Sequence, residues 1–139
     1  MRAPDRTHDR LAIANLNSAW CAKLDANDFP ALAALYTADA VYETLSGTFT
    51  GRDQIEAYFA SRVARGPRTT RHLTSGLTVE FDGEVRARGT SVCLSFAQDG
   101  TPPLPIHAHL VADFHDEYVR DPQDGWLIAR RVITPVFTG

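Results

Sequence analysis

The chain has 139 residues, which is enough for one domain with a sizeable hydrophobic core. Hydrophobic residues make up 44% of it, the net charge is −3, and no run of like charge suggests a nucleic-acid or membrane-surface partner. No apolar stretch approaches the roughly 20 residues of a membrane span, and the polar N-terminus lacks the apolar segment of a signal peptide. We therefore expect a cytoplasmic protein that binds neither nucleic acid nor a membrane.

Helices dominate the predicted structure of the first half of the chain. Residues 1–6 are expected to form a loose tail, and apolar residues between Leu11 and Leu24 then recur at helical spacing. Asp28 is suited to cap a second helix, which is predicted to end near residue 39. Short strands are indicated over 40–45 and 48–50, and a third helix over 52–65.

Four long strands are predicted in the second half, over 69–81, 84–96, 104–120 and 126–137. Helices followed by an antiparallel meander are typical of an α+β fold with the helices on one face of the sheet. A sheet of this size tends to curl, and helices that close one side of it leave a cone with an internal pocket. We find no repeat or linker, so residues 1–139 are expected to form a single domain.

Asp25 lies where the first predicted helix ends, and the negative end of the helix dipole does not favour a carboxylate there. Either water solvates this carboxylate, or another residue of the fold interacts with it. His72, on the first long predicted strand, is the candidate partner. An imidazole whose one nitrogen donates to a carboxylate can accept a proton with the other. The alternation along 72–79 leaves open which face of the sheet His72 occupies.

Several motifs together resemble the SnoaL-like branch of the nuclear transport factor 2-like superfamily, which includes scytalone dehydratase and bacterial bile-acid dehydratases. The resemblance covers about residues 8–137 and rests on Trp20–Phe29, Ala38–Tyr42, Gly51–Ile55, Thr70–Leu73, and Phe114–Arg120 followed by Asp124-Gly-Trp. It implies a curved antiparallel sheet wrapped on three N-terminal helices, a cystatin-like α+β barrel.

The resemblance also implies roles for individual residues. In these dehydratases an aspartate at the end of the first helix pairs with a histidine on the first long strand, and Asp25 and His72 match these positions. The tyrosine that polarises the substrate carbonyl matches Tyr42. A second histidine of the scytalone enzyme falls at Ser95, and a tyrosine of the bile-acid enzymes falls at Trp20. We expect Asp25, His72 and Tyr42 to be catalytic, and Trp20 and Ser95 to contact substrate.

The predicted strand 104–120 and the cysteines leave further alternatives. His107, His109, Asp113 and His115 share one face of that strand, where they could line the pocket, bind a metal, or form a polar outer or dimer surface. No Cys or Glu completes a metal site, and the resembled dehydratases use no metal, so we favour substrate contacts for His107, His109 and Asp113. Cys21 and Cys93 are expected to be reduced, partly buried thiols.

Arg130 and Arg131 lie on opposite faces of the last predicted strand, so at most one can reach the pocket. The inward one could hold an anionic group of the substrate. A surface or interface ion pair is the simpler interpretation.

The predicted function is a cofactor-independent lyase or isomerase of dehydratase type, acting by Asp–His acid/base catalysis on a hydrophobic, oxygenated cyclic small molecule. One alternative is a polyketide-type cyclase or epoxide-opening enzyme with Asp25, Asp113 or Asp116 as the acid. Another is a non-catalytic ligand-binding or accessory dimerisation module, such as a dioxygenase small subunit. The resemblance also leads us to expect a homodimer.

Overall fold

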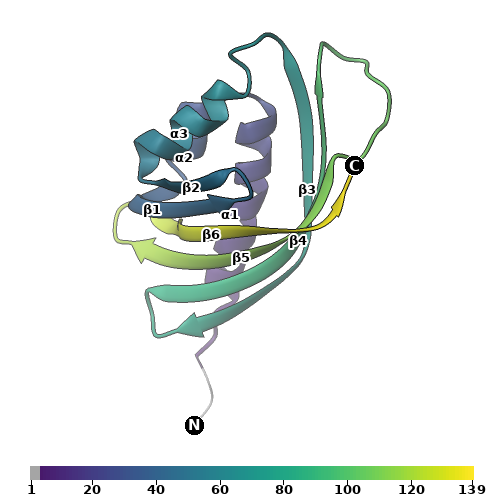
Figure 1. The fold of residues 1–139 in the computed structure, drawn as a ribbon. Helices are drawn as coiled ribbons and strands as arrows, with labels where there is room; N and C mark the ends of the chain where they lie inside the picture. Colours follow the sequence, from purple (N-terminus) through teal and green to yellow (C-terminus); the bar gives the residue numbers. More distant parts are fainter. Residues whose placement is uncertain (1–3) are drawn as a thin grey trace.

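The computed structural model describes residues 4–139 and contains three helices and one six-stranded sheet. The elements in chain order are α1 (Thr7–Asp25), α2 (Phe29–Ala33), β1 (Tyr36–Thr44), β2 (Gly47–Thr50), α3 (Arg52–Ser61), β3 (Arg68–Asp82), β4 (Arg86–Asp99), β5 (Leu110–Asp121) and β6 (Gly125–Thr138). The sheet curves around the helices, which all lie on its inner side (Figure 1). The predicted α+β class and the curved sheet are thereby confirmed.

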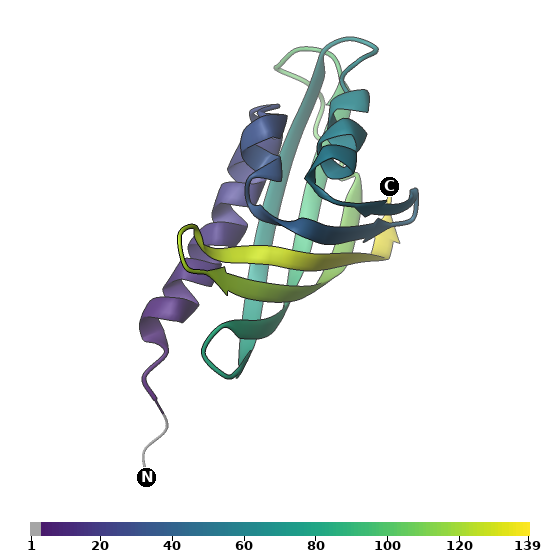
Figure 2. The ribbon, with the colours of Figure 1, turned by 90° about the vertical axis from the view of Figure 1, so that its left-hand side faces the viewer.

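The strand order is β2-β1-β6-β5-β4-β3, so β2 and β3 are edge strands and the sheet is not closed. Four of the strand pairings are antiparallel, whereas β1 runs parallel to β6. The sheet is therefore mixed rather than wholly antiparallel. Figure 2 shows α1 crossing the inner face beside the long strand β3. The interior between α1 and the sheet is filled by buried aromatic and aliphatic side chains.

The second helix and the first strand differ from the prediction. Helix α2 ends at Ala33, and β1 already begins at Tyr36, four residues before the predicted strand. The side chain of Tyr36 is fully buried, and its backbone pairs with Ile128 of β6. Pairing and burial in the core therefore override the helix propensity of the alanines around it. Helix α3 likewise ends at Ser61, and a turn over 62–65 replaces its predicted last residues.

The predicted strand over 104–120 is wrong in its first part, because β5 begins only at Leu110. Pro102, Pro103 and Pro105 have no backbone N–H to donate to a sheet, so this segment stays a loop. The loop is nevertheless anchored at its end. The His109 N–H donates to the Ser95 carbonyl at 2.8 Å, and the Gly139 N–H donates to the His109 carbonyl at 2.9 Å. Figure 1 shows the end of β6 beside this loop.

Residues 1–3 of the expected tail lie outside the described residues. Arg6, at the end of that tail, is held in place by several contacts. Its Nε donates to Asp9 at 2.7 Å, and Nη1 donates to the Gly83 carbonyl at 2.8 Å. Its guanidinium also lies 3.9 Å from the centre of the Phe81 ring. Within residues 4–139, none of the helices combines the length and the apolar character that crossing a membrane would require.

A bulge in β3 decides which side chains face the interior. Between Ser75 and Thr78, two residues of β3 lie opposite a single residue of β4. One of them is Gly76, whose φ of 68° lies in the left-handed region. Before the bulge, His72 faces inward and Leu73 is 54% exposed. After it, the apolar residues of β3 face inward, so the strand changes parity at Gly76.

We predict that Gly76→Ala lowers the free energy of unfolding by about 1 kcal/mol, because an Ala at this positive φ is strained although the space around it is open. Urea unfolding measures the change. Gly76→Asn should lower the free energy of unfolding by less, since Asn tolerates the left-handed region. The exposed neighbour variant Ser75→Ala is the control, and an equal loss in Ser75→Ala would contradict the explanation.

Candidate active site

The end of α1 is shaped by its own sequence so that Asp25 reaches β3. Asn27 adopts a left-handed conformation with φ of 56°, and the Asp28 N–H donates back to the Lys23 carbonyl at 3.0 Å. Asp28 then caps α2, as predicted, by accepting from the Ala31 N–H at 3.2 Å. The chain therefore turns away immediately after Asp25 and leaves its carboxylate free to meet the strand.

The Asp25 carboxylate receives three hydrogen bonds from β3. Its Oδ1 lies 2.7 Å from Nδ1 of His72 and accepts from the Thr70 hydroxyl at 2.9 Å. Its Oδ2 accepts from the backbone N–H of His72, also at 2.9 Å. The side chains of His72 and Asp25 are only 9% and 13% exposed. An Nδ1–H donated to the carboxylate leaves Nε2 of His72 as the free acceptor.

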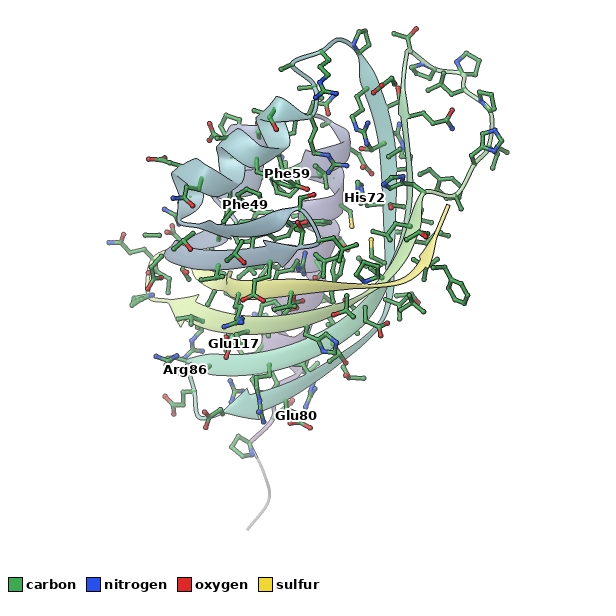
Figure 3. The ribbon with its side chains drawn as sticks, in the orientation of Figure 1. Phe49, Phe59, His72, Glu80, Arg86 and Glu117 are labelled. Atoms are coloured by element: carbon green, nitrogen blue, oxygen red, sulfur yellow. The ribbon has the colours of Figure 1, made fainter. Side chains whose placement is uncertain are left out.

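His72 lines a pocket of about 280 Å³ between the sheet and the helices. Figure 3 shows its side chain on the side of β3 that faces the helices, whereas Glu80, Arg86 and Glu117 lie toward the other end of the sheet. The buried part of the wall is formed by Trp20, Tyr42, Cys93, Ser95, Ala112 and Phe114. Leu45, Ser46, His109 and Thr138 are exposed and mark its mouth.

Tyr42 projects from β1 into this wall and is only 5% exposed. Its hydroxyl makes no hydrogen bond to any other residue in the range 4–139, so its O–H can donate to a bound molecule. Burial, reinforced by the neighbouring Tyr36 and Tyr58, raises the pKa of Tyr42 well above its usual value. The phenol therefore stays protonated at neutral pH and acts as a donor.

Trp20 lies in the wall as expected, but its N–H is already used. The indole Nε1–H donates to the Tyr36 hydroxyl at 2.8 Å. The ring meets the His72 imidazole edge to face, with centroids 5.6 Å apart. Trp20 thus packs against the imidazole and presents an apolar surface to the pocket rather than a hydrogen-bond donor.

The other expected contact residues separate into two groups. Ser95 and His109 line the pocket, and Ser95 lies directly opposite His72 in the β3–β4 pairing. His107 is exposed in the loop and is not part of the pocket wall. Asp113 lies on the outer face of β5, because the inward positions of that strand are taken by its neighbours Ala112 and Phe114. These two expected contacts are therefore not made in this pocket.

The shared strand face predicted for the histidines is not formed, because the loop carries two of them. Within residues 4–139, no three Cys, His, Asp or Glu side chains lie close enough together to bind a metal ion.

Both cysteines are free and buried. Burial raises the pKa of the Cys93 thiol, which lines the pocket, to about 12. It is therefore a neutral thiol and not a thiolate at neutral pH.

Two residues of the candidate site were not predicted from the sequence. Thr70, which holds the Asp25 carboxylate, could have been found from its place two residues before His72 on the same strand face. Arg62 lines the pocket from the turn after α3, but it fell inside a predicted helix whose end was misplaced. The sequence offered no local signal for it.

Arg131 is the inward one of the two arginines of β6, yet it does not reach the pocket. It is fully buried, and its Nε and Nη2 donate to the two carboxylate oxygens of Asp116 at 2.8 and 2.9 Å. Although burial alone would lower it, the Asp116 carboxylate raises the pKa of Arg131, so the ion pair stays charged. Arg130 instead pairs with Glu43 at the surface.

Asn17 and Tyr118 complete this buried cluster. The Tyr118 hydroxyl donates to Asp116 at 2.6 Å, and the Asn17 amide donates to the Tyr118 oxygen at 3.0 Å. The Asn17 carbonyl oxygen accepts from Arg131. Since Asn17 lies on α1 and the other members on β5 and β6, the cluster joins the helix to the sheet.

Comparison with known proteins identifies the family. The family model of the SnoaL-like domain matches residues 5–132. The chain belongs to the SnoaL-like domain family. No functionally curated protein matches the sequence.

Solved structures share the fold of this SnoaL-like protein. A protein of unknown function with a cystatin-like fold from Nostoc punctiforme matches with a TM-score of 0.81 and 18% identity, covering 98% of this chain and 96% of the other. A candidate scytalone dehydratase from Novosphingobium aromaticivorans matches with a TM-score of 0.81 and 23% identity, covering 94% of this chain and 86% of the other. ActVI-ORFA from Streptomyces coelicolor matches with a TM-score of 0.77 and 21% identity, covering 88% of this chain and 94% of the other. At these identities the likeness establishes the fold.

We predict that Asp116→Asn lowers the free energy of unfolding by about 3–5 kcal/mol, because it leaves the Arg131 charge buried without its carboxylate. Urea unfolding measures this loss. Glu43→Gln, which removes the carboxylate of the surface pair with Arg130, is the matched control and should cost less than about 1 kcal/mol. Equal losses in the two variants would contradict the structural role given to the buried pair.

Proposed function

We propose that this SnoaL-like protein is a cofactor-independent lyase or isomerase in which His72 is the general base. The observation that carries the proposal is the 2.7 Å contact between His72 Nδ1 and Asp25, made by an imidazole that lines the pocket. A carboxylate behind the ring fixes the tautomer and stabilises the imidazolium that forms. The proposed substrate class is a hydrophobic, cyclic ketone. Aromatic and aliphatic side chains surround the dyad, and the free O–H of Tyr42 can donate to a carbonyl oxygen.

The first step is removal of a proton from the carbon next to the substrate carbonyl. Nε2 of His72 takes the proton, and the electron pair of the broken C–H bond moves to the carbonyl oxygen. Tyr42 donates its O–H to the resulting enolate oxygen. Asp25 keeps the imidazolium in place, and the surrounding burial strengthens both interactions.

The second step depends on the substrate. If a hydroxyl lies β to the carbonyl, the enolate electron pair forms the C=C bond and the C–O bond breaks. The leaving oxygen takes the proton from the His72 imidazolium and departs as water. If the substrate instead has a C=C bond β,γ to the carbonyl, the first step gives a dienolate. The imidazolium then returns the proton to the γ carbon, and the double bond moves into conjugation with the carbonyl. Both outcomes are redox-neutral and use the same residues.

The alternatives considered for the sequence are less well supported. Of the three carboxylates considered for acid catalysis, Asp116 is buried against Arg131 and Asp113 lies on the outer face, which leaves Asp25. A non-catalytic module with a filled interior fits poorly with an open pocket of about 280 Å³. The homodimer expected from the family stays a prediction, for which the sedimentation mass is the test.

We predict that His72→Ala and Asp25→Asn each lower catalysed proton exchange on the order of 10²–10⁴-fold, because the base is lost or left unsupported. The measurement is deuterium incorporation next to the carbonyl of cyclic aromatic ketones, such as 2-tetralone, by NMR in D₂O. This assay needs only the first step, which dehydration and isomerisation share.

Matched control variants lie on the outer face of the sheet. His115→Ala and Asp113→Asn remove the same side chains from β5 and should leave the exchange rate unchanged. Full exchange activity in purified, folded His72→Ala would show that another group removes the proton.

Tyr42→Phe should lower the exchange rate roughly 10²-fold, because one donor to the enolate oxygen is lost. The variant should keep the wild-type unfolding midpoint, since the hydroxyl bonds no other residue within 4–139. Circular dichroism and the same NMR assay check the two parts of this prediction. An unchanged rate would remove Tyr42 from the mechanism.

A further inference from the structure

Arg62 brings a permanent positive charge to the pocket wall. It follows the last residue of α3, and its backbone N–H donates to the Phe59 carbonyl at 3.1 Å, so the turn fixes where its side chain begins. Phe59 itself is buried, with 1% exposure. The Arg62 side chain is half-buried and lines the same pocket as His72.

This guanidinium has no carboxylate partner. Within residues 4–139, Arg62 forms no ion pair and donates no side-chain hydrogen bond, whereas six other arginines of the chain each pair with Asp or Glu. Among the residues that line the pocket, no Asp or Glu side chain is present. Five guanidinium N–H donors are thus left to water or to a bound molecule.

The neighbourhood of Arg62 favours an anion. Burial, followed by the charges of Arg68 and Arg62, lowers the pKa of His109, so this imidazole at the mouth is neutral at neutral pH and brings no charge of its own. Nη1 of Arg68 pairs only with Asp99, whose side chain is 86% exposed, and its buried Nε has no partner within 4–139. Among the described residues, neither Arg62 nor Arg68 therefore has a buried carboxylate as its ion-pair partner.

We propose that Arg62 binds a carboxylate of the substrate, so that the ligand of this pocket is a hydrophobic cyclic carboxylic acid. The inference rests on the proposed function for the identity of the reacting end, which lies at His72. The carboxylate binds at Arg62, and the apolar ring system lies between them against Trp20 and Phe114.

The fork of a guanidinium matches a carboxylate with two parallel hydrogen bonds, which a neutral amide cannot reproduce. An acid group also orients the ring, because the Asp25 carboxylate behind His72 repels a second negative group. Binding of the acid group by Arg62 leaves the carbonyl to Tyr42 and His72.

The test compares ligands that differ only in the acid group. Binding of benzoate, 2-naphthoate and 1-naphthylacetate is measured by titration calorimetry against benzamide, 2-naphthamide and 1-naphthylacetamide. We expect the carboxylate of at least one pair to bind roughly tenfold more tightly than its amide, the size expected for a charge-assisted hydrogen bond at a partly exposed site. Arg62→Gln should abolish this preference.

The control variant is Arg65→Gln, in the same turn, which removes the same charge from an exposed arginine outside the pocket wall. It should keep the preference, and Arg62→Lys should keep part of it. The proposal is overturned if no carboxylate binds more tightly than its amide, or if Arg62→Gln and Arg65→Gln reduce the preference equally.

These titrations, together with the proton-exchange assay, separate this inference from the proposed chemistry. His72→Ala should keep the carboxylate preference while it loses proton exchange. Loss of exchange in Arg62→Gln with the preference unchanged would contradict the anion subsite and leave the His72 mechanism standing. A preference that disappears in Arg62→Gln, together with unchanged exchange in His72→Ala, would support the subsite and reject the mechanism.

Discussion

The buried ion pair of Arg131 and Asp116 holds the inner layers of this protein together. A charge without solvent is tolerated only when it is paired and hydrogen-bonded, and here Asn17 and Tyr118 supply the further bonds. The guanidinium carbon lies 4.7 Å from the centre of the Trp20 ring and 4.6 Å from that of Phe114. Both residues also line the pocket, so the cation supports part of the pocket wall.

Because Asn17 and Trp20 belong to α1, this cluster also fixes the position of the helix on the sheet. The end of α1 then delivers Asp25 to β3, where the carboxylate binds both the backbone and the side chain of His72. Three hydrogen bonds to one carboxylate leave it a single orientation. The His72 imidazole is therefore positioned by the packing of the whole helix and not by a flexible loop, which is the arrangement that the proposed proton transfer would require.

The pocket divides into two chemically distinct regions. Its buried end combines the dyad with the neutral Tyr42 phenol, in surroundings where electrostatic interactions are strong. Another part of its wall carries Arg62, which is half-buried and remains in contact with solvent. An acid group bound there would keep part of its hydration while the ring system fills the apolar middle. Binding and chemistry would thus depend on different residues, so variants can separate them.

Local sequence determined the helix of residues 7–25, the Asp28 cap, the α+β class and the two residues of the dyad, because these features follow from periodicity, capping and motif. Tertiary structure alone decided the start of β1 at Tyr36, the loop before Leu110 and the burial of Arg131. It also decided the inward face of His72, since the parity of β3 changes at the Gly76 bulge and depends on its register with β4. Periodicity reports which residues share a face, whereas only the partners across the sheet and beneath it determine which face is inside.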